Sequence, residues 1–155
     1  MEKKPFIFGV ATSGDNFTDR EKETSRLVLN FRHGVNTVLI SPRRWGKTSL
    51  VQKACRLAQS DKLKVVYIDI FSCRSDRDFY DAFASAILKQ TSSKLDEWLE
   101  HAKLFLSRIS PKISLGTDPM TDFSISLEMN PKSNEIDEIL QLPEKIAQKK
   151  GCNIV

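Results

Sequence analysis

Cysteine and histidine are scarce in this chain, which has 155 residues, three cysteines and two histidines. Cys55, Cys73 and Cys152 form no C-x-x-C pair, and His33 and His101 do not complete a zinc-ligand spacing. The sequence therefore offers no zinc site. A small, odd number of cysteines suits a reducing compartment, so we expect a cytoplasmic protein.

Long apolar runs are also missing. The apolar residues between Pro5 and Ala11 follow two lysines, but this run is too short, and too interrupted by Gly9, to form the core of a signal peptide. No apolar run approaches the length of a membrane-spanning helix, so we expect no membrane association.

Neither sign of charge dominates the composition. Lys and Arg number 24 against 20 Asp and Glu, which gives a formal net charge of +4. Apolar residues make up 40% of the chain and charged residues 28%, which fits one globular domain with a real core. The positive surplus is small and scattered, so nucleic-acid binding by this segment is not supported.

The most informative stretch of the sequence is Ser41-Pro42-Arg43-Arg44-Trp45-Gly46-Lys47-Thr48-Ser49. It lies between an apolar run over 35–40 and a helical pattern that starts at Leu50. A strand, a tight loop ending in Gly-Lys-Thr and a helix present backbone N–H groups to nucleotide phosphates in a P-loop. The alternative is a chance tripeptide at the start of an ordinary surface helix. A following apolar stripe favours the phosphate-binding interpretation: Leu50, Val51, Ala54, Leu57 and Ala58.

Each residue type in the loop has a chemical reason to be there. Gly46 lets the backbone approach a phosphate closely, and the ammonium group of Lys47 can reach the β- and γ-phosphate oxygens. Thr48 offers a hydroxyl to Mg²⁺. Ser41 replaces the glycine that usually opens this motif, and Pro42 lacks a backbone donor. The N–H groups from about Arg44 to Ser49 must then form the phosphate cradle.

A helix is predicted ahead of the loop. Thr18-Asp19-Arg20-Glu21 has the form of a capping box, an apolar face follows, and Gly34 marks the helix end. Phe17 and Arg20 have two interpretations: a core anchor and a solvated charge, or contacts with the adenine side of a nucleotide.

A second strand is predicted over 65–71, after the loop helix, which completes a βαβ unit. Asp69 lies near the end of this strand, where ligands of α/β sheets gather. It is either a metal- or substrate-facing acid or the cap of the next loop.

The rest of the chain predicts helices and a β-hairpin. Ser75 to Asp78 has the spacing of a helix start, a second helical stripe runs from Leu95 to Leu106, and their aromatic residues are expected in the core. Alternating apolar residues between 113 and 129 predict a hairpin, either a contact surface or a cover over the core. A helix from Ser133, with Pro143 in a first turn, ends at Gly151. A new strand is expected to begin at Cys152.

Taken together, several motifs resemble those of the prokaryotic AAA-like ATPases of the STAND group, which share a Pro-Arg-Arg-x-Gly-Lys-Thr-Ser-Leu loop. The resemblance spans nearly all 155 residues. It rests on the loop at 42–50, the Phe17-x-x-Arg20-Glu21-x-Glu23 segment, Tyr67-Ile68-Asp69, the hairpin and Leu142-Pro143-Glu144.

The resemblance implies an α/β fold, the three-layer sandwich of P-loop NTPases of the ASCE type, incomplete and with a β-hairpin insertion. Its parts would be a lead-in strand and helix over 1–34, the P-loop βαβ unit with the following helix over 35–91, a helix and hairpin over 94–130, and a helix with the start of a strand over 133–155. The implied cofactors are ATP and Mg²⁺. The implied activity is that of an ATPase working as a regulated switch.

The same resemblance assigns roles within the loop. Ser41 would open the phosphate cradle, Lys47 would be the catalytic lysine, and Thr48 would hold the metal. It also strengthens the expectation that Phe17 and Arg20 lie near the adenine. The paired arginines Arg43 and Arg44 match the family, with no role assigned to them.

The chain departs from the family pattern at its end. The strand beginning at Cys152 should close in Asp-Glu, which would help hold Mg²⁺ and orient the attacking water, and neither residue is present. We therefore expect the N-terminal portion of a longer protein, with weak Mg²⁺-ATP binding, hardly any hydrolysis and exposed strand edges. A protein partner, or self-association through the missing part, would complete it.

Two alternative functions stay open. One is a P-loop kinase in which Asp69 lies beside the loop and handles metal or acceptor. The other is a non-catalytic interaction module that uses the hairpin on a protein or DNA partner. Sheet order separates the first from an ATPase, because a kinase would pair the strand of Asp69 directly with 35–40.

Overall fold

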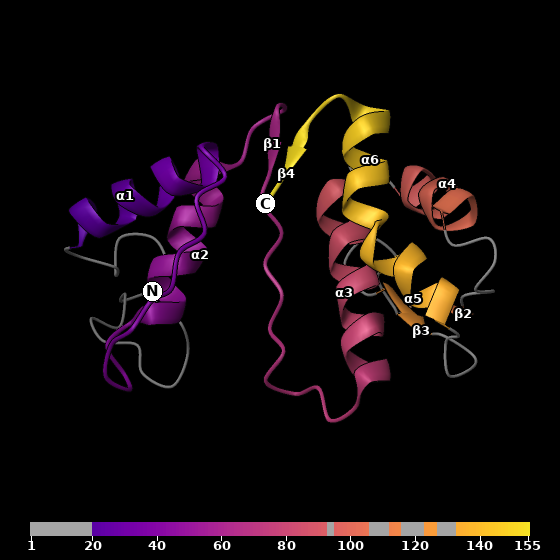
Figure 1. Ribbon diagram of the computed structural model, residues 1–155, viewed down its shortest axis with the longest axis horizontal. Coiled ribbons are helices and arrows are strands. Elements are labelled where there is room, and N and C mark those ends of the chain that lie inside the picture. The colour runs from indigo at the N-terminus through magenta and orange to yellow at the C-terminus, as the bar shows by residue number, and fades with distance from the viewer. Residues whose placement is uncertain (1–19, 93–94, 106–111, 116–122, 127–132) are drawn as a thin grey trace, which may run out of the picture. The chain divides into compact units, whose positions relative to one another are not determined.

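The computed structural model describes residues 20–92, 95–105, 112–115, 123–126 and 133–155 (Figure 1). These residues fall into two compact units, one of residues up to 65 together with Val155, and one of residues 66–154. The elements in chain order are α1 (Glu21–Arg32), α2 (Lys47–Ala58), β1 (Leu63–Lys64), α3 (Asp76–Thr91), α4 (Leu95–Phe105), β2 (Lys112–Leu115), β3 (Phe123–Ser126), α5 (Ser133–Leu140), α6 (Leu142–Lys150) and β4 (Asn153–Ile154).

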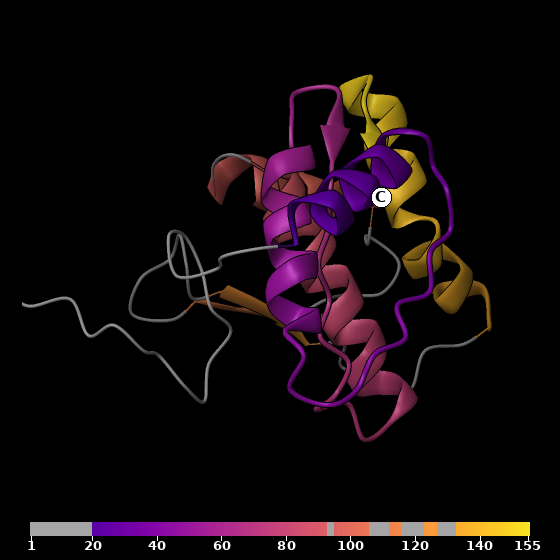
Figure 2. The same ribbon diagram turned by 90° about the vertical axis from the view of Figure 1, so that its left-hand side faces the viewer.

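The first unit is built on the packing of α1 against α2, which lie side by side in Figures 1 and 2. Leu27 of α1 packs against Leu50 and Ala54 of α2, and all three are buried. This confirms the predicted apolar faces of both helices, with one exception. Leu57, which was predicted to belong to the α2 stripe, is exposed. The burial of these two helix faces supplies the apolar contacts that hold the loop between them in place.

The start of α1 differs from the predicted capping box. Arg20, rather than Thr18, is the N-cap residue, and its backbone is left-handed with φ 67° and ψ 31°. The buried Thr24 donates to the carbonyl oxygen of Arg20 through both its backbone N–H (3.0 Å) and its hydroxyl (2.9 Å). In a capping box, the side chain of the N-cap residue would accept a hydrogen bond from the first turn of the helix. Here the hydroxyl of Thr24, in the first turn, instead donates to the backbone carbonyl oxygen of the N-cap residue.

The two long strands expected around the loop helix are mostly not formed. Residues 35–40 are extended without a described strand partner, and Val38 and Ile40 are 84% and 92% exposed. Only Leu63–Lys64 forms a strand near the expected 65–71 run. A strand is stabilised by the hydrogen bonds of its neighbours, so an apolar sequence alone does not form one.

In the segment after β1, a side chain forms the backbone hydrogen bonds that a neighbouring strand would otherwise form. Gln90 of α3 accepts a hydrogen bond from the N–H of Tyr67 and donates to its carbonyl oxygen, both at 2.9 Å. One amide side chain thereby satisfies both polar groups of one backbone residue.

The second unit is a helical core that carries the hairpin. Ala84, Ile87 and Leu88 of α3 pack against Ile139, Leu142 and Ile146 of α5 and α6. The predicted helix start at Ser75 is confirmed as a capping box with Asp78. The predicted hairpin is also confirmed: β2 and β3 pair antiparallel, with Lys112 opposite Ser126 and Leu115 opposite Phe123. Gly151 ends α6 at φ 62°, and β4 follows it as expected.

A charged cluster holds the ends of α4 and α6 together around a buried histidine. Lys149 pairs with Glu100 at 2.6 Å and Lys150 pairs with Glu97 at 2.7 Å, while Lys150 also donates to the carbonyl oxygen of Thr91. His101 is 2% exposed among them, with its Nδ1 at 3.4 Å from the hydroxyl of Ser92. Burial, together with the ammonium groups of Lys149 and Lys150, lowers the pKa of His101.

We predict that the chain loses stability between pH 7.5 and pH 5.5. Because the pKa of His101 is lower in the folded chain, the unfolded chain binds the proton first as the pH falls through about 6.5. Denaturant unfolding followed by circular dichroism should give a lower midpoint at pH 5.5, and His101→Gln should flatten this dependence.

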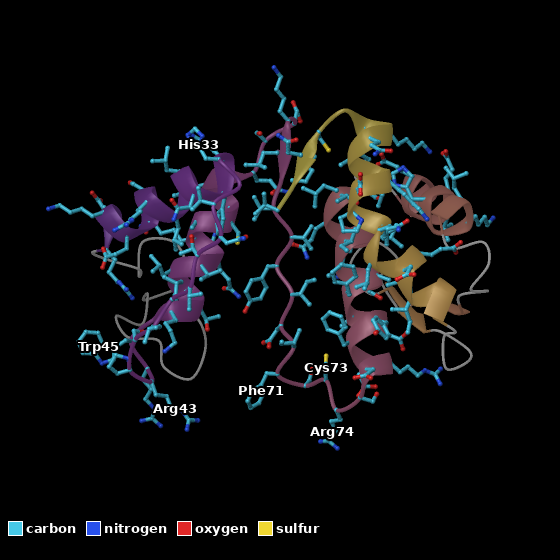
Figure 3. The ribbon with its side chains drawn as sticks, in the orientation of Figure 1. His33, Arg43, Trp45, Phe71, Cys73 and Arg74 are labelled. Carbon is cyan, nitrogen blue, oxygen red and sulfur yellow. The ribbon has the colours of Figure 1, made fainter. Side chains whose placement is uncertain are left out.

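The matched control is His33→Gln, because His33 is exposed on the other unit (Figure 3). That variant should keep the pH dependence of the wild type. Hydrogen bonds from Arg74 and Lys149 lower the pKa values of Asp78 and Glu100, so these carboxylates lose their stabilising charge only below about pH 4. An unchanged midpoint in the wild type from pH 7.5 to 5.5 would show that the histidine is not coupled to folding.

Candidate phosphate-binding loop

The loop over 41–46 approaches α2 with an alternating backbone. Arg44 and Gly46 are both left-handed, with φ 67° and φ 70°, while Trp45 between them is not. Alternation of this kind turns successive N–H groups toward one concave side, which is the geometry of an anion-binding nest. Gly46 takes this conformation without steric cost, whereas Arg44 takes it despite its Cβ. The strain at Arg44 is consistent with a loop shaped for a ligand.

Lys47 closes the loop onto the helix that follows it. It is the first residue of α2, and its ammonium group donates to the carbonyl oxygens of Ser41 at 2.8 Å and Pro42 at 2.9 Å. The lysine therefore folds back over the loop and does not extend into solvent. Its positive charge therefore lies at the start of the loop, on the carbonyl oxygens of residues 41 and 42.

The first turn of α2 adds further donors to the same place. The N–H of Leu50 bonds to the carbonyl oxygen of Gly46 at 2.9 Å, so the N–H groups before it lie outside the intrahelical ladder. The turn contains no acidic residue that would compete for them. The positive end of the helix dipole adds to the charge of Lys47, and an anion is favoured there.

The remaining predicted loop residues differ in exposure. Thr48 is exposed at the second position of α2, where its hydroxyl is accessible to a metal ion, and Ser49 is buried. The hydroxyl of Ser41 makes a long contact of 3.5 Å with the carbonyl oxygen of Pro42. Arg43 and Trp45 extend outward from the loop in Figure 3, and Trp45 is 65% exposed.

Arg20 is brought to the loop from 25 residues away. Its guanidinium donates from Nη1 to the carbonyl oxygen of Trp45 at 2.7 Å and from Nε to Glu23 at 3.3 Å. The sequence left two interpretations of Arg20, a solvated charge or a contact with the adenine side of a nucleotide. In the structure its guanidinium contacts the backbone of the loop. Phe17, its predicted companion, lies outside the described residues.

Of the two roles that the sequence left open for Asp69, the structure shows the cap of the next loop. Its carboxylate accepts a hydrogen bond from the N–H of Phe71 at 3.0 Å, which caps the turn ahead of α3. The described residues contain no group of three His, Cys, Asp or Glu side chains placed to hold a metal ion. A metal at the loop would therefore depend on Thr48 and on the phosphate oxygens of a ligand.

A hollow of about 510 Å³ lies elsewhere on the first unit and was not predicted. Its described lining comes from α1 and residues 35–39, including Glu23, Arg26 and Asn30, and not from residues 41–49. Asn30 donates to the hydroxyl of Thr37 at 2.8 Å across one end. The hollow is open, and it exists because residues 35–39 run beside α1 without forming a strand. No periodicity in the sequence indicates it.

Comparison with known proteins leaves the chain without a match. No family model matches it, and no similar protein was found among curated proteins or solved structures. Among the described helices, none is both long and apolar enough to span a membrane.

We predict opposite stability effects at the two left-handed loop positions. Arg44→Gly should stabilise the chain by about 0.5–1 kcal/mol, because glycine removes the steric penalty of positive φ. Gly46→Ala should destabilise it by about 1–2 kcal/mol, because alanine introduces that penalty. Denaturant unfolding of both variants beside the wild type measures the difference. Equal effects of the two substitutions would mean that the loop does not keep this backbone in solution.

Proposed function

We propose that the chain binds Mg²⁺-ATP through the loop over 41–49, as part of an ATPase-type regulatory switch. The single observation that supports this most is the position of Lys47. Its ammonium group donates to two carbonyl oxygens of the same loop that contains the left-handed residues Arg44 and Gly46. A cation, a concave backbone and a helix N-terminus all belong to this loop, and a polyphosphate is the ligand that matches all three.

Each loop residue then has a task. Lys47 exchanges part of its bonding to the carbonyl oxygens of Ser41 and Pro42 for the β- and γ-phosphate oxygens. The N–H groups of residues 44–49 surround the phosphates, and the hydroxyl of Thr48 is the protein ligand of Mg²⁺, which keeps several of its waters. ATP hydrolysis would need an acid to orient water, which residues 41–49 do not supply.

The ATPase class is favoured over the kinase class by the neighbour of β1. A kinase would pair the strand leading to Asp69 with residues 35–40. The carbonyl oxygen of Lys64 in β1 instead accepts a hydrogen bond from the N–H of Val155 at 2.9 Å. This agrees with the ATPase sheet order, in which the strand after Cys152 lies beside that strand. The carboxylate of Asp69 accepts a hydrogen bond within its own turn, which also counts against its use as the acid of a kinase.

The setting that we propose is the cytoplasm. Cys55, Cys73 and Cys152 are all free thiols, and burial raises the pKa of the Cys55 thiol above its ordinary value. Free cysteines suit a reducing compartment. A protein partner or self-association remains part of the proposal, with the exposed apolar residues 38–40 as one of its supports.

We predict that Lys47→Ala weakens Mg²⁺-ATP binding by about tenfold to 100-fold, because a charge-assisted contact with phosphate is lost. Isothermal titration calorimetry on the 155-residue chain measures this. Arg56→Ala is the matched control, since Arg56 is an exposed cation in the last turn of the same helix. Equal affinity of the wild type and Lys47→Ala would refute the phosphate role.

We also predict that Thr48→Ala acts through the metal. The variant should weaken binding of Mg²⁺-ATP more than binding of ATP in the presence of a chelator, because only the metal complex uses the hydroxyl. Titrations with and without Mg²⁺ separate the two. A loss of the same size in both conditions would assign Thr48 to the phosphates or to the fold, and not to the metal.

A further inference from the structure

The contact between Arg20 and the loop joins two backbone positions that are both unusual. Arg20 is left-handed at φ 67°, and the carbonyl oxygen that it holds belongs to Trp45, between the left-handed residues Arg44 and Gly46. The bond from Nη1 measures 2.7 Å, which is typical of a charge-assisted hydrogen bond. It crosses from the start of α1 to the last peptide unit before α2.

This peptide unit matters because its other polar group is the N–H of Gly46. In a planar trans peptide the carbonyl oxygen and the N–H point in opposite directions. Holding the oxygen of Trp45 toward Arg20 therefore turns the N–H of Gly46 to the opposite side. A rotation of this peptide would remove one donor from the concave side of the loop.

The side chain of Arg20 is itself held in place. Two hydrogen bonds from the buried Thr24 fix its carbonyl oxygen, at 3.0 Å and 2.9 Å, and Glu23 accepts from its Nε at 3.3 Å. A strained backbone conformation persists only where surrounding contacts hold it, and Arg20 has such contacts at its backbone and at its side chain. The guanidinium is therefore held in one orientation toward the loop.

We propose that Arg20 is a positioning residue of the phosphate loop, which orients the Trp45–Gly46 peptide so that the N–H of Gly46 faces the phosphates. This inference rests on the proposed function of the loop. It differs from a contact between Arg20 and the adenine, because a positioning residue affects every ligand that carries the phosphates, with or without a base.

The experiment compares two ligands, Mg²⁺-ATP and inorganic tripolyphosphate with Mg²⁺, on the 155-residue chain. Calorimetry with Arg20→Ala should show both affinities falling by the same factor, about tenfold, since a charge-assisted hydrogen bond is lost. Arg20→Lys keeps a charged donor and should recover part of both losses. Thermal melting of each variant confirms that the chain is folded during the titrations.

A matched variant serves as the control. Arg26→Ala removes an exposed arginine from the same helix. It should bind the two ligands within about twofold of the wild type, because exposed charges contribute little.

The outcomes separate this inference from the proposed function. A wild type that binds neither ligand refutes the proposed function. Unchanged binding in Arg20→Ala, with the wild type binding both ligands, refutes only the positioning role. A loss confined to ATP assigns Arg20 to the base and overturns the inference as well. If Arg20→Ala does not fold, Arg20→Lys carries the comparison, and a loss shared by both ligands remains the supporting result.

Discussion

The structure around the loop depends on one cation bonded to two backbone carbonyl oxygens. The ammonium group of Lys47 reaches back from the first turn of α2 to Ser41 and Pro42, at 2.8 Å and 2.9 Å. This closes six residues of irregular backbone onto a rigid helix. It thereby helps to hold the loop that contains the left-handed residues Arg44 and Gly46. The loop is thus preorganised by the same charge that would meet a phosphate.

The loop is connected to its surroundings through α1. Leu27 packs on Leu50 and Ala54, which fixes α1 against α2, and Arg20 extends from the start of α1 to the loop. A ligand that moves the Trp45 peptide would therefore change the contact that holds the first turn of α1. If the proposed function holds, these contacts would connect the bound phosphates to the helices of the unit, as a nucleotide-dependent switch requires.

An apolar sequence pattern was not sufficient to predict the strands expected beside these helices. Residues 35–40 have the composition of a buried strand, yet Val38 and Ile40 are almost fully exposed. A helix satisfies its backbone within itself, so α1 and α2 form from their own sequence. A strand needs a neighbour, and residues 35–40 have no described one. The hairpin forms because β2 supplies β3 with its partner after a short connection.

The sequence by itself determined the local features: the apolar faces of α1 and α2, the capping box at Ser75, the hairpin, and a loop in which Gly46 and Lys47 stand at the start of a helix. These depend on residues within a few positions of one another, so periodicity and capping rules suffice. Only the tertiary structure decided that Arg20 bonds to Trp45, that His101 is buried close enough to two lysines for their charges to lower its pKa, and that residues 35–40 lie exposed. Each of these features depends on which segments, far apart in the sequence, lie close together in the folded chain. Packing of the whole chain decides this, and a short sequence pattern does not encode it.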